Sequence, residues 1–238
     1  MTESKRLRRS AEAMAGGAAP SGLAACIDGR AGLLRARAAG ERLAGLAAGL
    51  GEAPVSLLTR GQEGTAFRHF PAGDVYDLSS HAQFYYHSHR DGEFGHIHLF
   101  QRPRGMPRGL APLVATADPD APCHLIAVGF GARGEATELF TTNRWVTGEA
   151  WYRADAVKAM VAGLRLAPAG PWAPVARWLA AMVEFYRPLI DVLIDERDQA
   201  VAAWGRAHPG RDELNDERLE ITSARSIDPA ADLAGLGP

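Results

Sequence analysis

Four of the eight histidines of the chain lie within fourteen residues, in the stretch YYHSHRDGEFGHIH. They form two His-x-His pairs on either side of an Asp-Gly turn signal: His87, His89, His96 and His98. Residues two apart on a strand point to the same face, so each pair can present two imidazoles together. Imidazole is a common metal ligand that suits zinc, iron and copper. The spacing therefore predicts a site for a divalent transition metal (Zn, Fe or Cu) with these four histidines as ligands.

The length of the loop between the two pairs decides whether they share a face. If the Asp-Gly pair forms a two-residue turn, His87 lies opposite His96 and Tyr85 lies opposite His98. A six-residue loop would instead set His89 opposite His96. Both even-length loops place all four imidazoles on one side, whereas an odd-length loop would separate them. Because Asp-Gly favours the two-residue turn, we expect the imidazoles to converge.

Other polar residues could take part in the chemistry of this site. Tyr85 and Glu93 are the nearest acid-base candidates, and Asp91 or Glu93 could add a carboxylate ligand. Arg144, in the segment TTNRWVTGE, could clamp a carboxylate or phosphate of a substrate, because guanidinium binds these groups bidentately. An equally good interpretation of this segment is a strand-to-helix turn whose Thr and Asn side chains cap backbone groups.

The elements that must position these residues indicate an α+β fold. Helical patterns cover 23–50, 154–164 and 172–207, and Pro188 should kink or split the last of them. Between the first and second of these helical patterns, short β-branched and aromatic runs predict an antiparallel sheet of four to five strands. We expect the N- and C-terminal helices to pack on one face of this sheet and the histidine hairpin to lie on the other. The predicted strands are 64–70, 81–89, 95–101, 124–130 and 137–146.

We expect a flexible N-terminal segment (1–22) and a single α+β domain (23–238) with its central sheet at about 64–147. The tail RLEITSARSID could add an edge strand. Asp74 and Asp77 are predicted to form turns. His69 and His124 stand at strand ends and could be outer-shell partners of the metal site, although single histidines are more often structural.

Composition excludes several classes of protein. The formal net charge of −2, from 26 basic and 28 acidic residues, argues against nucleic acid or an anionic membrane as a partner. No stretch is long and apolar enough to span a bilayer. Cys26 and Cys123 lie far apart and outside any C-x-x-C spacing, which fits reduced thiols and a cytoplasmic location.

Three segments, FPAGDVYD, YYHSHRDGEFGHIHLF and FTTNRWVTGE, resemble an uncharacterised bacterial family of domains of unknown function. The resemblance covers about 67–162 and implies that the histidine hairpin and the segment around Arg144 belong to one unit. His87 and His89 are also similar to the HSH of JAMM-type metalloisopeptidases. Together with Glu93 they resemble the H-x-H-x3-E core of a first cupin motif. The second cupin motif and the aspartate ligand of the JAMM pattern are absent from this sequence.

The function predicted from these observations is that of a metal-binding protein, most simply a metal-dependent enzyme of hydrolase or non-haem oxygenase type acting on a small molecule. The alternatives are a non-enzymatic metal or haem-binding protein and a metal-free protein of another function. An enzyme requires an open coordination position beside a cleft. A storage or sensing protein would have every position filled, and a metal-free protein would bind no ion.

Overall fold

A single antiparallel sheet forms the centre of the computed structural model, which describes residues 22–60, 68–89 and 94–237. Each strand pairs with the next one along the chain, so the order in the sheet is β1-β2-β3-β4-β5-β6. The strands are β1 (Phe70–Tyr76), β2 (Ala82–His87), β3 (His96–Gln101), β4 (Cys123–Phe130), β5 (Ala136–Thr142) and β6 (Ile221–Ser226). The α+β prediction is confirmed, with six strands in place of four to five.

Seven α-helices flank the sheet within the described residues. They are α2 (Gly29–Leu50), α3 (Pro54–Thr59), α4 (Arg144–Thr147), α5 (Ala154–Gly163), α6 (Ala173–Phe185), α7 (Arg187–Ala207) and α8 (Pro229–Gly235), with short 3-10 turns η1 (Leu23–Cys26) and η2 (Pro103–Gly105). The predicted split of the long C-terminal helix is confirmed. Pro188 lies in the first turn of α7, where its missing N–H costs no helical hydrogen bond. No described helix has the length and apolarity that a membrane crossing requires.

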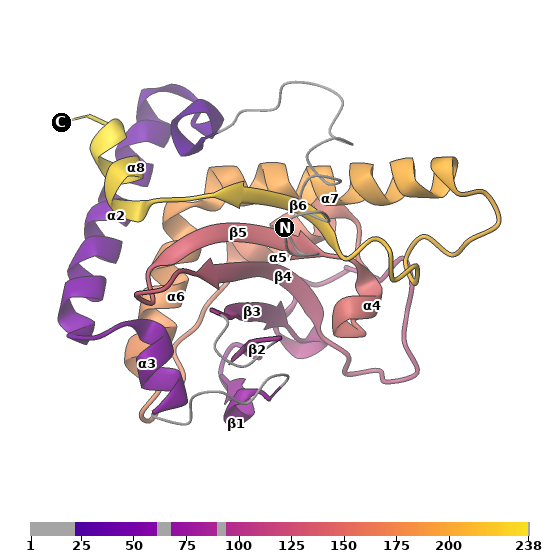
Figure 1. Cartoon of the computed structure of the whole chain (residues 1–238), viewed down its shortest axis with the longest axis horizontal. Coiled ribbons are helices and arrows are strands. Elements are labelled where there is room, and N and C mark those ends of the chain that lie inside the picture. The colour runs from indigo at the N-terminus through magenta and orange to yellow at the C-terminus, as the bar shows by residue number, and fades with distance from the viewer. Residues whose placement is uncertain (1–21, 61–67, 90–93, 238) are drawn as a thin grey trace.

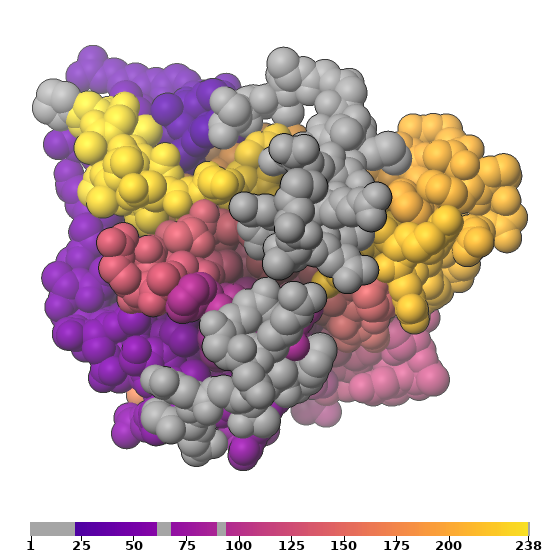
Figure 2. Space-filling view, in the orientation of Figure 1, coloured from indigo at the N-terminus to yellow at the C-terminus, as the bar shows by residue number. Residues whose placement is uncertain are grey.

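The helices lie mainly behind the sheet, as Figure 1 shows for α5, α6 and α7, while α2 runs along one end. The core is packed between these layers. Ser223 Oγ of β6 donates to the Leu193 carbonyl of α7, and the Phe130 ring of β4 lies 6.0 Å from that of Trp178 in α6. In the space-filling view, α2 and the C-terminal α8 lie together at the left edge (Figure 2). This two-layer packing leaves the other face of the sheet for the histidines.

Two predicted strand boundaries are wrong. The strand expected at 64–70 lies instead at Phe70–Tyr76, and residues 64–67 of the prediction are outside the described residues, as is most of the segment 1–22. The turn predicted at Asp74 falls inside β1. Gly73 and Asp74 adopt positive φ there and form an irregularity in the pairing with β2. The strand expected at 137–146 ends at Thr142, where α4 soon begins. The tail strand is confirmed as β6.

Asp77 forms the predicted turn, between β1 and β2. Its buried carboxylate accepts hydrogen bonds from the Ser79 N–H and hydroxyl, the Ser80 hydroxyl and the backbone N–H of Ala167. Burial alone would raise the pKa of Asp77, but these hydrogen bonds outweigh it and lower the pKa to about 2. Asp77 therefore joins the β1–β2 turn to the segment that follows α5.

We expect Asp77→Ala to lower the free energy of unfolding by about 2 kcal/mol, because it removes the four hydrogen bonds that the buried carboxylate accepts from the turn and from Ala167. Urea denaturation at pH 7 measures this. Asp118→Ala is the matched control, since Asp118 is exposed and accepts its turn hydrogen bond from Asp120 N–H in solvent. The folded pKa lies below the usual 3.8, so the contribution of Asp77 is present above pH 3.8 and is lost as pH falls toward 2. Equal losses in both variants would contradict the assignment.

Candidate metal centre

The register of β2 and β3 brings the two halves of the histidine motif together. His87 pairs with His96 and Tyr85 pairs with His98. This is the pairing predicted for a two-residue turn, and it is confirmed, although the turn residues themselves (90–93) lie outside the described residues. We call the face of the sheet that carries Tyr85, His87, His96 and His98 the histidine face.

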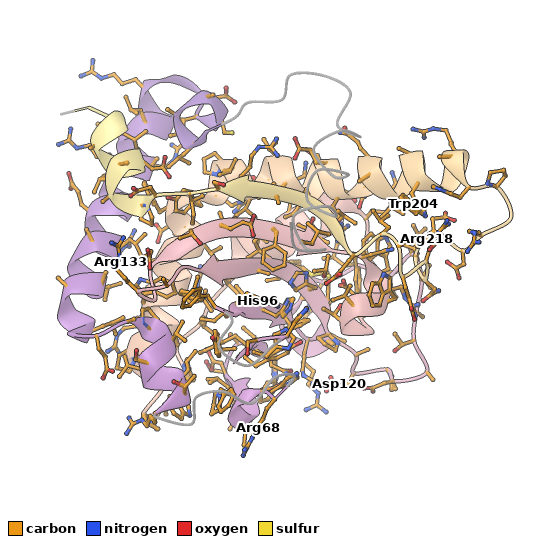
Figure 3. The ribbon with its side chains drawn as sticks, in the orientation of Figure 1. Arg68, His96, Asp120, Arg133, Trp204 and Arg218 are labelled. Carbon is orange, nitrogen blue, oxygen red and sulfur yellow. The ribbon has the colours of Figure 1, made fainter. Side chains whose placement is uncertain are left out.

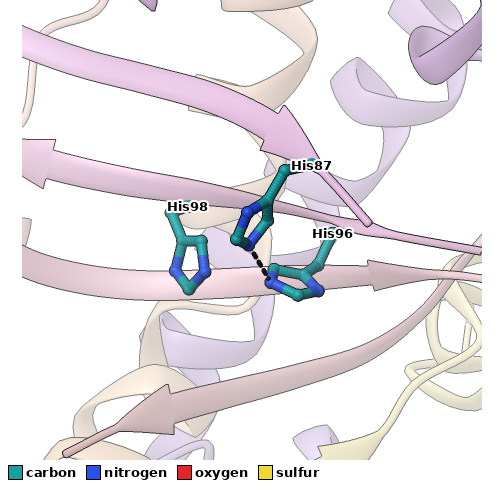
Figure 4. A group of neighbouring side chains, drawn as sticks. All are labelled: His87, His96 and His98. Carbon is teal, nitrogen blue, oxygen red and sulfur yellow. Dashed lines mark hydrogen bonds between the residues drawn. The ribbon is translucent and has the colours of Figure 1, made fainter. Parts of the chain in front are cut away.

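Three imidazoles converge on this face. One ring nitrogen from each of His87, His96 and His98 lies within 4.8 Å of the other two. His87 Nε2 is 2.7 Å from His96 Nε2, so one of the two nitrogens carries a proton and donates a hydrogen bond to the other. Figure 4 shows the three rings on the same side of β2 and β3, with this contact dashed. Metal-nitrogen bonds of about 2.0 to 2.1 Å would hold two ligand nitrogens about 3 Å apart, so an ion fits after a small opening of this pair.

His89 lies beside the three histidines. Its ring centroid is 5.1 Å from that of His87 and 5.2 Å from that of His96, but its nitrogens are not within the group that spans 4.8 Å. Its role as a fourth ligand stays a prediction. His96 itself lies near the middle of the sheet, far from Trp204 in α7 and Arg218 in the connection between α7 and β6 (Figure 3).

The electrostatics of the site favour neutral imidazoles, the form that binds a metal. Burial, followed by the neighbouring histidines His96 and His124, holds the pKa of His98 well below its usual value of 6.5. Burial, then His89 and His69, lowers the pKa of His87 to about 4. At neutral pH both rings therefore offer a lone pair and not a positive charge.

A cavity of about 170 Å³ adjoins the cluster. Its walls include His96, His98, Phe94, Phe140 and Glu138. Gly129 of β4 pairs with His96 of β3 on one side and with Glu138 of β5 on the other. A Cβ at this glycine would contact the Glu138 side chain. The cavity therefore has room for a small molecule next to two of the three histidines.

Tyr85, the first acid-base candidate, is close to the cluster. Its ring centroid lies 5.4 Å from that of His87 and 5.5 Å from that of His98, and the His69 ring stacks on it at 3.6 Å. Burial and the Asp74 carboxylate raise the pKa of Tyr85, so its phenol stays protonated at neutral pH. Tyr85 can donate a hydrogen bond there but is a poor base.

His69 also contacts the site, because its ring stacks on Tyr85 and lies 5.7 Å from that of His87. The Asp74 carboxylate accepts hydrogen bonds from His69 Nδ1, at 2.9 Å, and from Gln83 Nε2. Asp74 is thus a structural partner of the histidine face, where the sequence predicted only a turn. The alternation of polar and apolar residues in the sequence carries no signal for the positive φ of Asp74.

The two other catalytic candidates are placed differently. Glu93 lies outside the described residues, so its role stays a prediction. Arg144 is the first residue of α4, and its Nη1 donates to Asn215 Oδ1. It is not among the described residues that line the cavity. Asn143 caps α4 by accepting from the Arg144 N–H, so the strand-to-helix turn with an Asn cap is confirmed. Among the described residues, the threonine hydroxyls of the segment bond to other side chains and not to the backbone, so that part of the interpretation is wrong.

His124 joins the cluster because β4 is irregular. The β3–β4 register shifts between Leu99 and Phe100, so that Phe100 pairs with His124 while Leu99 pairs with Ile126. This bulge turns His124 to the histidine face, although Ile126, two residues on, is in the hydrophobic core. His98 Nδ1 lies 3.0 Å from His124 Nε2, so His124 is a hydrogen-bond partner of His98, and its role as an outer-shell partner of a metal ion stays a prediction.

These features define an α+β protein with a cluster of imidazoles on one face of an antiparallel sheet. Residues 35–227, well over half of the chain, match the family described as a domain of unknown function (DUF6969), and the chain belongs to this family. The predicted resemblance to an uncharacterised family is thereby confirmed, whereas the partial cupin and JAMM similarities are not supported. No curated protein and no solved structure matches the chain.

Proposed function

We propose that the protein binds one divalent transition metal ion through His87, His96 and His98 and is a metal-dependent enzyme acting on a small molecule. The observation that carries this proposal is the convergence of three imidazole nitrogens within 4.8 Å at the wall of a cavity. Three protein ligands beside a cavity are typical of a catalytic metal site, because the remaining coordination position is left for water or substrate.

The donor set narrows the chemistry but does not select the ion. An all-imidazole set without thiolates suits zinc, iron or copper. A bound zinc ion would supply an acidified water for hydrolysis, whereas iron or copper would supply oxygen chemistry. Tyr85 would donate a hydrogen bond to the substrate, and Glu93 is proposed as the base. Arg144 as an anion clamp, the cytoplasmic location, and the absence of nucleic acid and membrane partners remain predictions.

A second candidate is a non-enzymatic metal-binding protein. The position of the His89 ring, about as close to His87 as to His96, favours it. If His89 were the fourth ligand, the sphere of a four-coordinate ion such as zinc would be filled and no position would face the cavity. His89→Ala separates the two candidates: the enzyme retains its ion with nearly unchanged affinity, and the saturated site loses affinity strongly.

We expect the chain, purified without a histidine tag, to contain about one transition metal ion per molecule by elemental analysis. His96→Ala and His98→Ala should each lower the affinity for zinc by at least 100-fold, because two imidazoles cannot complete the site. Competition with a chromogenic chelator measures the affinity. His208→Ala is the control, because His208 lies at the end of α7, stacked on Trp204. Metal content that is low and equal in wild type and all variants would refute the proposal.

A further inference from the structure

His98 and His124 form a buried imidazole pair under the candidate metal centre. They are 1 % and 3 % exposed, and His98 Nδ1 is 3.0 Å from His124 Nε2. A neutral imidazole has one donor and one acceptor nitrogen, so only one of these two atoms carries a proton. The tautomer of one ring therefore determines the tautomer of the other.

The segment Thr141–Glu149 holds His124 in place from two sides. His124 Nδ1 is 3.4 Å from the hydroxyl of Thr142, and the backbone N–H of His124 donates to Glu149 Oε2 at 2.6 Å. Thr142 and Glu149 are both buried. These contacts connect the segment TTNRWVTGE to the histidine hairpin through His124. The connection does not depend on the role predicted for Arg144 as a substrate clamp.

We propose that His124 is a positioning residue that fixes His98 as the Nδ1-protonated tautomer, with Nε2 facing the metal ion. This inference rests on the proposed function. In this arrangement His98 Nδ1–H donates to His124 Nε2, and His124 Nδ1–H points to the Thr142 hydroxyl. Binding of an ion at His98 Nδ1 would break the buried hydrogen bond and leave His124 Nε2 without its donor. Outer-shell partners of this kind orient metal ligands and raise their basicity.

The test replaces the acceptor and measures both affinity and tautomer. In His124→Phe, which keeps an aromatic ring next to Phe100, zinc affinity should fall by about 10-fold to 100-fold. Imidazole 15N spectra should show His98 losing its single tautomer.

In His124→Gln the amide oxygen can accept from His98 Nδ1, so part of the affinity should return. In Thr142→Val, which removes only the hydroxyl, His98 and His124 should either both keep their tautomers or change them together, because each ring determines the tautomer of the other. His208→Phe is the control and should change neither quantity.

The outcomes separate this inference from the proposed function. If His124→Phe folds and retains both the zinc affinity of wild type and the His98 tautomer, the positioning role is refuted while the metal site stands. If wild type binds no zinc, the proposed function fails, and the 15N spectrum of the metal-free protein still tests the pair. A His98 ring protonated on Nε2 in that spectrum refutes the inference. If His124→Phe does not fold, a Thr142→Val protein in which only one of the two rings changes its tautomer refutes it.

Discussion

Gly95→Ala is expected to destroy the histidine cluster and to lower the free energy of unfolding by about 3 kcal/mol or more. A Cβ at this position would lie 2.0 Å from the carbonyl oxygen of His87 and 2.8 Å from the Tyr86 ring. The first neighbour is backbone, so it can move only if β2 separates from β3. Because Gly95 precedes His96, that separation would pull apart two of the three proposed ligands.

Hydrogen bonds at Gly95 increase the expected effect. Its N–H donates to the Tyr86 hydroxyl, and its carbonyl accepts from the Phe130 N–H of β4. A shift of this residue therefore disturbs three neighbouring strands together. Urea denaturation and zinc affinity measure the two consequences. Gly45→Ala is the matched control, because a Cβ there meets nothing within 4 Å on the exposed side of α2, and we expect a gain of about 0.5 to 1 kcal/mol. A Gly95→Ala protein with native stability and zinc affinity would contradict the proposed packing.

The convergence of His87, His96 and His98 could be predicted from sequence because it depends on local rules. Side chains alternate across a strand, and the Asp-Gly signal favours an even loop, so the two His-x-His pairs could share a face. Both rules operate within fourteen residues. No distant part of the chain had to be placed for the register of β2 and β3 to be predicted correctly.

His124 could not be placed by the same reasoning. Regular alternation assigns it to the face of Ile126, which packs in the core, and only the bulge opposite Leu99 and Phe100 reverses it. A bulge adds one residue to one strand, and its position depends on packing between strands that are distant in sequence. The contact between Thr142 and His124 could not be predicted for the same reason, because it depends on how β4 and β5 pair.

The first and last strands show how weakly local sequence signals determine strand formation. The Gly and Asp of β1 resemble a turn because both residues tolerate positive φ, and that property here produces an irregular strand. β6 alternates only weakly, yet it pairs with β5 because the returning α7 brings it to the sheet edge. Propensity is a weak guide where tertiary pairing decides the conformation.

Loss of stability in mild acid is the second large effect that we expect, for the metal-free protein. Burial lowers the pKa of His124 to about 3, with Arg197 contributing next, and also lowers the pKa values of His98 and His87. Below pH 6.5 the unfolded chain therefore takes up protons at these residues that the folded protein does not. Stability from a depressed histidine is present above the unfolded pKa of 6.5 and is lost as pH falls toward the folded value.

Glu149 acts in the opposite direction. Burial raises its pKa to about 7, against the opposing effects of Arg197 and its hydrogen bonds, so the folded protein retains a proton there that the unfolded chain loses above pH 4.5. The stability that this proton contributes is present below pH 4.5 and is lost as pH rises to 7. Near pH 5.5, unfolding takes up about one proton at each of the three histidines and releases about one proton from Glu149. The net uptake of about two protons changes the free energy of unfolding by about 3 kcal/mol per pH unit.

Chemical denaturation at pH 7, 6 and 5, with a chelator present, measures this slope. We expect the free energy of unfolding to fall steeply below pH 6.5, and His124→Phe to reduce the slope by about one proton whatever its effect on stability at pH 7. His208→Asn is the control, since it removes a histidine at the end of α7, outside the cluster. An unfolding free energy that is constant between pH 7 and pH 5 would show that the imidazoles are not buried as neutral groups, and with that the electrostatic basis for metal binding would be lost.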